Sequence, residues 1–214
     1  TFEELLEIKN FLETHPESFF AIDFNRSFSP MILQIATSLQ QRYSPLLINY
    51  RVNAGLMCMH SSPQNFYSRI VGEICHFYEM FLFLVKSNPI RLTVACSGSG
   101  LEAFEENMSI SVVFDDGSIA NLFYSSLANS ALGKERGEFF WDKKSIVLDD
   151  YKSLTGYGFT KSLDMYNLVP DKGHAAILSK FLCSVKTNNN KVFSTLWDRY
   201  FLVSWLTLKT EELL

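Results

Sequence analysis

Three ionisable side chains at helical spacing stand out in the 214-residue sequence. Glu73, His76 and Glu79 are three residues apart, so on a helix they lie on one face, each one turn from the next. A carboxylate one turn from an imidazole can orient the ring and raise its basicity, which makes His76 a candidate general base with Glu73 as its partner. From spacing alone, a surface ion pair without chemistry is the alternative. As a metal site this set is weak, because it lacks a second histidine.

A second candidate is a row of polar side chains within a predicted strand. In Asn49-Tyr50-Arg51-Val52-Asn53, strand alternation places Asn49, Arg51 and Asn53 on one face. Amides and a guanidinium in a row suit a ligand rich in hydroxyl groups. A solvated sheet face explains the same pattern, and both interpretations stay open.

Two other kinds of chemistry find little support in the sequence. The run Gly98-Ser99-Gly100-Leu101-Glu102-Ala103 fits a dinucleotide fingerprint, but the next predicted strand begins at Met108, which leaves no room for the required helix. Nucleophilic catalysis is also disfavoured, because no G-x-S-x-G motif is present and Cys75 points to a different side of the helix from His76.

The elements that must position these residues are strands in the middle of the chain and helices at both ends. Strands joined by hairpins and segregated from helices predict an α+β fold with a large open antiparallel or mixed β-sheet and helices on one face. We expect helices at 2–14, 30–42, 72–86, 172–186 and 193–209, strands at 19–24, 45–53 and 89–96, hairpins at 109–124 and 136–148, and a loop at 54–71.

Composition limits the class of protein and its partners. Hydrophobic residues make up 47% and the chain has 19 Phe, so a packed core forms and disorder is excluded. The net charge of −4, without a cluster of basic residues, argues against nucleic acid and against an anionic membrane surface. No apolar run is long enough to span a bilayer, no leader is evident and no CxxC pair occurs, so we expect a cytoplasmic protein with reduced thiols. An aromatic-rich sheet face predicts a homodimer or higher homo-oligomer.

Several segments, taken in order, resemble one known family. They are Ala21 to Pro30 (AIDFNRSFSP), Asn49 to Gly55, Arg69 to Phe77 (RIVGEICHF), Asp116 to Ala120, Leu148 to Tyr151 and Asp171 to Ala175 (DKGHA). Together they resemble the C-terminal half of the glucose-fructose oxidoreductase and inositol dehydrogenase family (Gfo/Idh/MocA). The phrasing is most similar to the branch found in polysaccharide gene clusters.

This resemblance implies a division of labour between two domains. Residues 1–24 would be the C-terminal remnant of a Rossmann domain that binds NAD or NADP, and residues 25–214 would be the substrate and oligomerisation domain. The cofactor would be held by the missing Rossmann domain, so we expect no cofactor bound to this chain and no turnover by the chain alone. The whole protein would be a dehydrogenase acting on a sugar, a sugar nucleotide or a cyclitol.

The resemblance also assigns roles to individual residues. His76 stands at the position of the family histidine that takes the proton from the substrate hydroxyl, with Glu73 as its partner. Contacts to the sugar-like substrate would come from five residues: Arg26, Arg51, Asn53, Lys172 and His174. Gly72 stands where many members have Asp, and Ser27 where Arg is common. These departures leave an alternative, a catalytically degenerate module for assembly or carbohydrate binding.

Overall fold

The sheet has eight strands in the order β2-β3-β4-β1-β5-β6-β7-β8. The computed structural model describes residues 1–55, 69–97 and 107–214. The strands are β1 (Leu47–Asn53), β2 (Pro89–Cys96), β3 (Asn107–Phe114), β4 (Ile119–Ser125), β5 (Glu135–Trp141), β6 (Lys144–Asp149), β7 (Ser153–Tyr157) and β8 (Met165–Tyr166). β1 runs parallel to β4, and every other neighbouring pair is antiparallel. The sheet is therefore mixed, as the sequence predicts.

Turn chemistry explains how tightly the antiparallel strands connect. Asp142 and Lys143 join β5 to β6 with φ angles of 45° and 60°, the left-handed conformation that a two-residue hairpin turn requires. Asp150 and Tyr151 adopt the same conformation between β6 and β7, with φ angles of 49° and 56°. The second turn carries Tyr151 into the core, where its side chain is fully buried.

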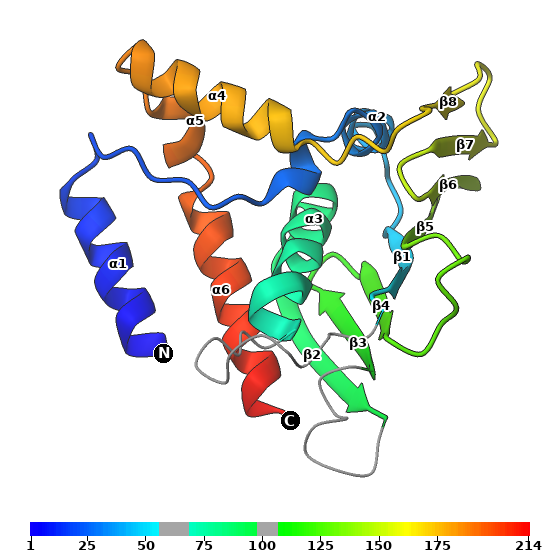
Figure 1. Ribbon diagram of the computed structural model, residues 1–214, viewed down its shortest axis with the longest axis horizontal. Helices are drawn as coiled ribbons and strands as arrows, with labels where there is room; N and C mark the ends of the chain where they lie inside the picture. Colours follow the sequence, from blue (N-terminus) through cyan, green and yellow to red (C-terminus); the bar gives the residue numbers. More distant parts are fainter. Residues whose placement is uncertain (56–68, 98–106) are drawn as a thin grey trace.

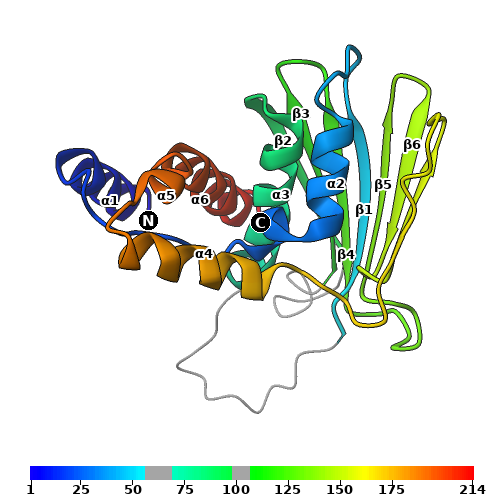
Figure 2. The ribbon, with the colours of Figure 1, turned by 90° about the horizontal axis from the view of Figure 1, so that it is seen from above.

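The helices lie in layers on one face of the sheet. They are α1 (Phe2–Thr14), the 3₁₀ turn η1 (Asn25–Phe28), α2 (Pro30–Ser38), the π-helical turn η2 (Ile70–Ile74), α3 (Cys75–Val85), α4 (His174–Lys186), α5 (Lys191–Ser194) and α6 (Trp197–Glu212). Seen from above, α2 and α3 lie next to the sheet, and α4, α6 and α1 lie farther out (Figure 2). α6 packs between α3 and α1 (Figure 1).

The core forms between α3 and the inner face of the sheet. α3 is almost entirely apolar and nearly every residue in it is buried, as expected for a helix covered on all sides. On β1 the inward residues Ile48, Tyr50 and Val52 are buried, and the Tyr50 ring packs on Phe77 of α3 with centroids 5.4 Å apart. This packing fixes the side of α3 that faces the sheet and therefore the direction of His76.

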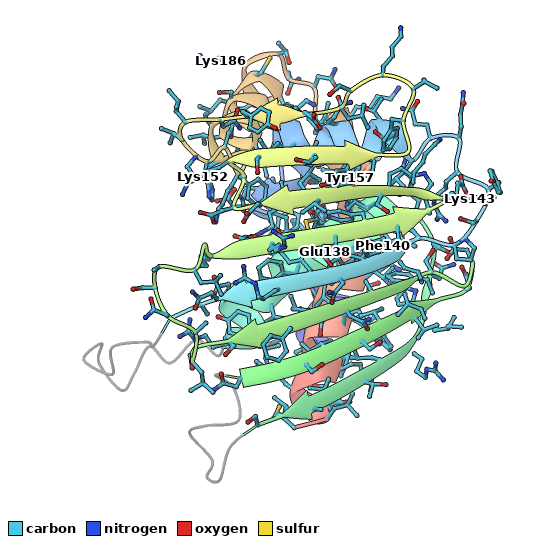
Figure 3. The ribbon with its side chains drawn as sticks, turned by 90° about the vertical axis from the view of Figure 1, so that its right-hand side faces the viewer. Glu138, Phe140, Lys143, Lys152, Tyr157 and Lys186 are labelled. Carbon is cyan, nitrogen blue, oxygen red and sulfur yellow. The ribbon has the colours of Figure 1, made fainter. Side chains whose placement is uncertain are left out.

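The opposite side of the sheet, here called the outer face, carries side chains that point away from the helices. It includes Leu47, Asn49 and Arg51 of β1, Phe123 of β4 and Glu138 and Phe140 of β5. Figure 3 looks onto this face, with Glu138 and Phe140 toward the viewer and the helices behind the strands. Phe123 is 55% exposed and Leu47 is 47% exposed, so the face leaves sizeable apolar side chains uncovered.

Most of the predicted elements are confirmed, with three corrections. The strand predicted at residues 19–24 does not form. This segment packs against α6, away from the sheet, so it has no neighbouring strand to pair with. The helix expected to reach residue 42 ends at Ser38, and the one expected at 193–209 is divided into α5 and α6. The glycine motif at 98–103 and most of the predicted loop lie outside the described residues.

Gly137 is required by the close approach of Tyr50. The two residues pair across β1 and β5, and a Cβ at position 137 would lie 2.7 Å from the Tyr50 ring. We therefore expect Gly137→Ala to lower the free energy of unfolding by about 1–3 kcal/mol, the usual cost of overpacking. Urea denaturation of the two chains measures this difference. An unchanged midpoint would mean that the ring does not press on the strand backbone.

Candidate functional site

Polar side chains from three distant segments converge on the N-terminal half of α3. The segments are residues 23–28, the first turns of the helix around His76, and residues 171–174 at the start of α4. η1 contacts both α3 and α4, so it brings the three segments together. The group formed by Asp23, Arg26, His76, Lys172 and His174 is here called the His76 site.

His76 is partly buried at the centre of this site. The Phe24 ring packs nearly perpendicular to the imidazole, with centroids 5.5 Å apart. The Nδ1 atom is buried and has no hydrogen-bond partner among the described residues. Burial, reinforced by the nearby Arg26 cation, lowers the pKa of His76 to about 4, against the weaker opposing effects of Asp23 and Glu73. The imidazole is therefore neutral at pH 7 and can accept a proton.

Beneath the site, one buried carboxylate holds two cations. Glu135, at the start of β5, accepts two hydrogen bonds from Arg26, at 3.1 Å from Nε and 3.0 Å from Nη2. Lys172 Nζ donates to the same carboxylate at 2.6 Å and Tyr50 Oη at 2.9 Å. The Tyr151 hydroxyl lies 3.4 Å from the Tyr50 hydroxyl. These five residues are here called the Glu135 cluster.

Burial and neighbouring charges together determine the pKa values of the groups in the Glu135 cluster. Burial alone would raise the pKa of Glu135, but the Arg26 and Lys172 cations outweigh it and lower the pKa to about 2. Burial raises the pKa of the Tyr50 and Tyr151 hydroxyls, and the Glu135 charge adds to this effect, so both stay protonated. The Arg26 guanidinium also stacks on Phe77, 4.3 Å from the ring centroid. The hydrogen bonds to Glu135 and the stacking on Phe77 thus fix the orientation of the Arg26 guanidinium.

The outer rim of the His76 site is formed by the residues around α4. Asn25 Nδ2 donates to the Lys172 carbonyl at 2.7 Å and lies 3.3 Å from His174 Nε2. His174 is exposed, and its Nδ1 lies 3.9 Å from the Asp23 carboxylate. Lys172 reaches the Glu135 cluster but keeps 20% of its side chain exposed. Lys172 and His174 are therefore the predicted contact residues that a ligand could reach beside His76.

A groove of about 350 Å³ opens at this rim. Its walls come from segment 21–23 and from α4, and include Ala21, Ile22, Asp23, His174, Ile177 and Phe181. The lining is apolar except for the Asp23 and His174 end. A volume in this range, apolar walls and a few convergent polar groups are typical of small-molecule sites.

Glu73 does not pair with His76, which corrects one prediction. Its carboxylate accepts hydrogen bonds from Tyr124 of β4 and from Lys134, and Arg69 Nη1 lies 3.5 Å away. Burial opposes its ionisation, but the Lys134 and Tyr124 hydrogen bonds lower the pKa of Glu73 on balance. Glu73 therefore ties η2 to the sheet instead of orienting the imidazole.

Arg51 and Asn53 do not join the His76 site either, because both occupy positions of β1 that face the outer side of the sheet. The Arg51 guanidinium donates to the Gly133 carbonyl at 3.1 Å. Asn53 Nδ2 donates to the carbonyls of Asn129 and Leu132 at 3.0 and 2.9 Å. Both side chains hold the connection between β4 and β5, on the other side of the sheet from His76.

The residue that sequence reasoning missed is Glu135. The sequence pattern predicts a strand that begins at Arg136, one residue later, so Glu135 falls outside it. In β5 the positions of Glu135, Gly137, Phe139 and Trp141 alternate toward the core. A carboxylate that continues an apolar alternation is the signal of a buried ion pair, and it could have indicated this cluster.

The described residues do not fit a dinucleotide cofactor. Among them, no glycine turn leads from a strand directly into a helix, which is the unit that binds pyrophosphate. Within the same ranges, no three or more His, Cys, Asp or Glu side chains gather as a metal site. Within residues 1–55, 69–97 and 107–214, no helix is both long and apolar enough to cross a membrane.

Solved structures with the same fold are oxidoreductases and dehydrogenases. One is UDP-N-acetylglucosamine 3-dehydrogenase GnnA from Acidithiobacillus ferrooxidans, with a TM-score of 0.76 and 15% identity over 99% of this chain and 66% of that one. Another is an oxidoreductase from Agrobacterium radiobacter in complex with NAD⁺, L-tartaric acid and magnesium, with a TM-score of 0.77 and 12% identity over 98% and 67%. A third is the dehydrogenase MviM from Clostridium difficile, with a TM-score of 0.70 and 15% identity over 95% and 65%.

These likenesses establish the fold. The chain spans about two thirds of the length of the structures it matches. No protein-family model and no curated protein sequence matches it. The α+β class is confirmed, whereas the resemblance to the C-terminal half of the Gfo/Idh/MocA family and to its polysaccharide-cluster branch stays a prediction.

Proposed function

We propose that this chain is the substrate-binding and oligomerisation part of an NAD(P)-dependent oxidoreductase that acts on a hydroxyl or keto group of a sugar, a sugar nucleotide or a cyclitol. The observation that carries the proposal is a neutral His76 close enough to be influenced by Asp23 and His174, the two residues at the polar end of an apolar groove. The fold shared with oxidoreductases adds support. In this proposal residues 1–24 are the end of the nicotinamide-binding domain and residues 25–214 are the substrate domain.

In this proposal the residues of the His76 site have distinct tasks. His76 takes the proton of the substrate hydroxyl, because a neutral imidazole has a free lone pair for it. Lys172 and His174 contact the sugar-like substrate at the groove. Arg26 supports them from below, since its guanidinium is committed to Glu135. The hydride acceptor is a nicotinamide, bound by a part of the protein outside residues 25–214.

The surface of α1 supports the proposal of a further domain. Leu6, Ile8 and Phe11 on this helix are 58%, 45% and 54% exposed. Only Leu12 of the helix is buried, against a core that α1 reaches through α6. A helix with so much uncovered apolar surface fits a second layer of protein packed over it.

Ligand binding to the chain tests the proposed function. Amide spectra are recorded by NMR while the chain is titrated with UDP-N-acetylglucosamine or, separately, with NADH. We expect the sugar nucleotide to cause saturable shifts at His76, Lys172 and His174. NADH should cause none, since in this proposal the nicotinamide cofactor is bound by a part of the protein outside residues 25–214. Saturable binding of NADH would overturn the assignment of the cofactor to another domain, and no response to any sugar, sugar nucleotide or cyclitol would overturn the substrate role.

The oligomer is proposed to form through the outer face. On this face Leu47 of β1 lies opposite Phe140 of β5, Phe123 of β4 lies opposite Arg51, and the three apolar side chains are exposed. We expect light scattering at micromolar concentration to give the mass of a dimer or larger assembly, and Phe123→Asp to reduce it to the mass of one chain. A wild-type mass of one chain would contradict the proposal.

The second candidate is a catalytically degenerate module for assembly or carbohydrate binding. It is favoured by the commitment of Glu73 to Tyr124 and Lys134, which leaves His76 without a carboxylate hydrogen-bonded to it among the described residues. In that case sugars still bind, but replacing His76 has no effect on the role of the whole protein. The activity measurement described in the Discussion separates the two functions.

A further inference from the structure

Several polar atoms without partners gather between α3 and α6. Both carboxylate oxygens of Glu79, the Tyr200 hydroxyl, Arg199 Nε and His76 Nδ1 are buried and make no hydrogen bond to any described residue. Arg199 Nη2 lies 3.0 Å from Glu79 Oε1, an ion pair that lacks the direction of a hydrogen bond. The Glu79 side chain is 1% exposed, so bulk water does not satisfy it.

These atoms surround one aromatic ring. His76 and Glu79 are on successive turns of one side of α3. Arg199 and Tyr200 are adjacent on α6, which packs directly on α3. The Phe24 ring contacts both ends of the group, with centroids 5.5 Å from His76 and 5.4 Å from Tyr200. The Phe24 contacts and the packing of α6 on α3 therefore place these polar atoms in one region of the helical layers.

Leaving such groups unpaired destabilises a folded chain, since a buried polar atom without a partner has lost the hydrogen bonds that it made to water. Ordered water usually pays this cost by making two to four hydrogen bonds to atoms that the protein leaves unsatisfied. We propose that ordered water between α3 and α6 joins His76 Nδ1 to the Glu79 carboxylate, and that Glu79 receives the proton that His76 takes from the substrate. This rests on the proposed function, and it makes Glu79 a positioning and proton-storing residue behind His76.

The proton balance of the step is complete. When the substrate alcohol is oxidised, the hydride leaves its carbon for the nicotinamide, and the hydroxyl proton bonds to His76 Nε2. His76 then releases its Nδ1 proton to the water, which passes a proton to Glu79. The imidazole is neutral again and Glu79 is a carboxylic acid. In the reducing direction each bond forms and breaks in reverse order.

The charges around Glu79 suit this role. The groups that act on its charge are Arg199 and Tyr200 of α6, and Arg26 and Ser27 of segment 24–28. Burial raises the pKa of Glu79 to about 7, although the Arg199 and Arg26 cations oppose it. A carboxyl group that ionises near neutral pH can both accept and return a proton.

NMR of ¹⁵N-histidine-labelled chain tests the inference. The nitrogen shifts of His76 report which ring nitrogen carries the proton, and they should respond to a titration step near pH 7, separate from the imidazole's own step near pH 4. We expect Glu79→Gln to abolish the step near pH 7 and to shift the tautomer balance toward Nε2–H. Long-lived water should give cross-peaks to the Phe24 and Tyr200 rings in the wild-type chain.

Two further variants keep the test decisive. Glu17→Gln removes an exposed carboxylate on a loop and should leave the His76 spectrum unchanged. Tyr200→Phe removes one unpartnered hydroxyl and should weaken the water cross-peaks without unfolding the chain. An unchanged His76 titration in Glu79→Gln, together with no bound water, would overturn the inference. If that Glu79→Gln chain still binds sugar, the proposed function stays intact. If the wild-type chain holds bound water but binds no sugar, only the proposed function is rejected.

Discussion

Replacing Glu135 with alanine is expected to lower the free energy of unfolding by about 3–5 kcal/mol, the usual cost of removing one partner from a buried ion pair. Glu135 is fully buried, and two cations depend on it. Without the carboxylate, Arg26 stays buried with its charge uncompensated, and the Tyr50 hydroxyl loses its charged acceptor. Urea denaturation followed by circular dichroism measures the change.

Glu138→Ala is the matched control for this change. Glu138 lies three positions along the same strand on the outer face, where its contact to Arg136 is partly exposed. Removing it should alter the free energy of unfolding by no more than about 0.5 kcal/mol. Equal losses in the two variants would show that strand propensity, and not the buried charge, accounts for the effect at position 135.

The same carboxylate gives a pH signature with a defined sign. The pKa of Glu135 is about 2 in the folded chain, below the value of 4.5 that it has when exposed. Its contribution is therefore complete above about pH 4.5 and is lost as the pH falls toward 2. A shift of this size corresponds to about 3 kcal/mol. We expect wild type to lose stability steeply over this range and Glu135→Gln to lose less.

Replacing His76 with asparagine in the protein that unites this chain with a nicotinamide-binding domain is expected to lower kcat by about 10²–10⁴-fold. This is the usual contribution of a general acid or base. Asparagine keeps a polar side chain of similar reach but cannot take a proton near neutral pH. Steady-state rates of nicotinamide reduction with a sugar-type substrate measure the effect.

His15→Asn provides the control for the activity measurement. His15 ends α1, is exposed and stacks on Phe11, away from the His76 site. Its replacement should leave kcat unchanged. If His76→Asn also retained full activity, the proton relay would be wrong, and the degenerate module would be the better description of this domain.

The fold was largely predictable, since the sequence pattern carries strand and turn signals that are local. The alternation of Ile48, Tyr50 and Val52 identifies the inner face of β1, and Asp115-Asp116-Gly117 identifies the hairpin between β3 and β4. Residues 19–24 have the same apolar character, yet form no strand, because strand formation depends on a neighbour that the sequence pattern does not specify.

The candidate site was only partly predictable. Helical spacing predicts that Glu73, His76 and Glu79 share one face of a helix, but it could not reveal which partner each would meet across the fold. Glu73 meets Tyr124, which is 51 residues away, and Arg26 meets Glu135, which is 109 residues away. Such pairs depend on how sheet and helices pack, so burial and charge compensation decide them rather than local periodicity.

The position of β1 has a consequence for the route of folding. β2, β3 and β4 pair with their neighbours along the chain, as do β5 to β8, so each group can assemble from local contacts. β1 pairs with β4 and β5, both far ahead of it in the sequence. Contacts that close long loops form late, so we expect two separate meanders to appear first and β1 to bridge them in a slower step. Pulse-labelled hydrogen exchange would detect this order as late protection of the β1 amides, and early protection there would contradict it.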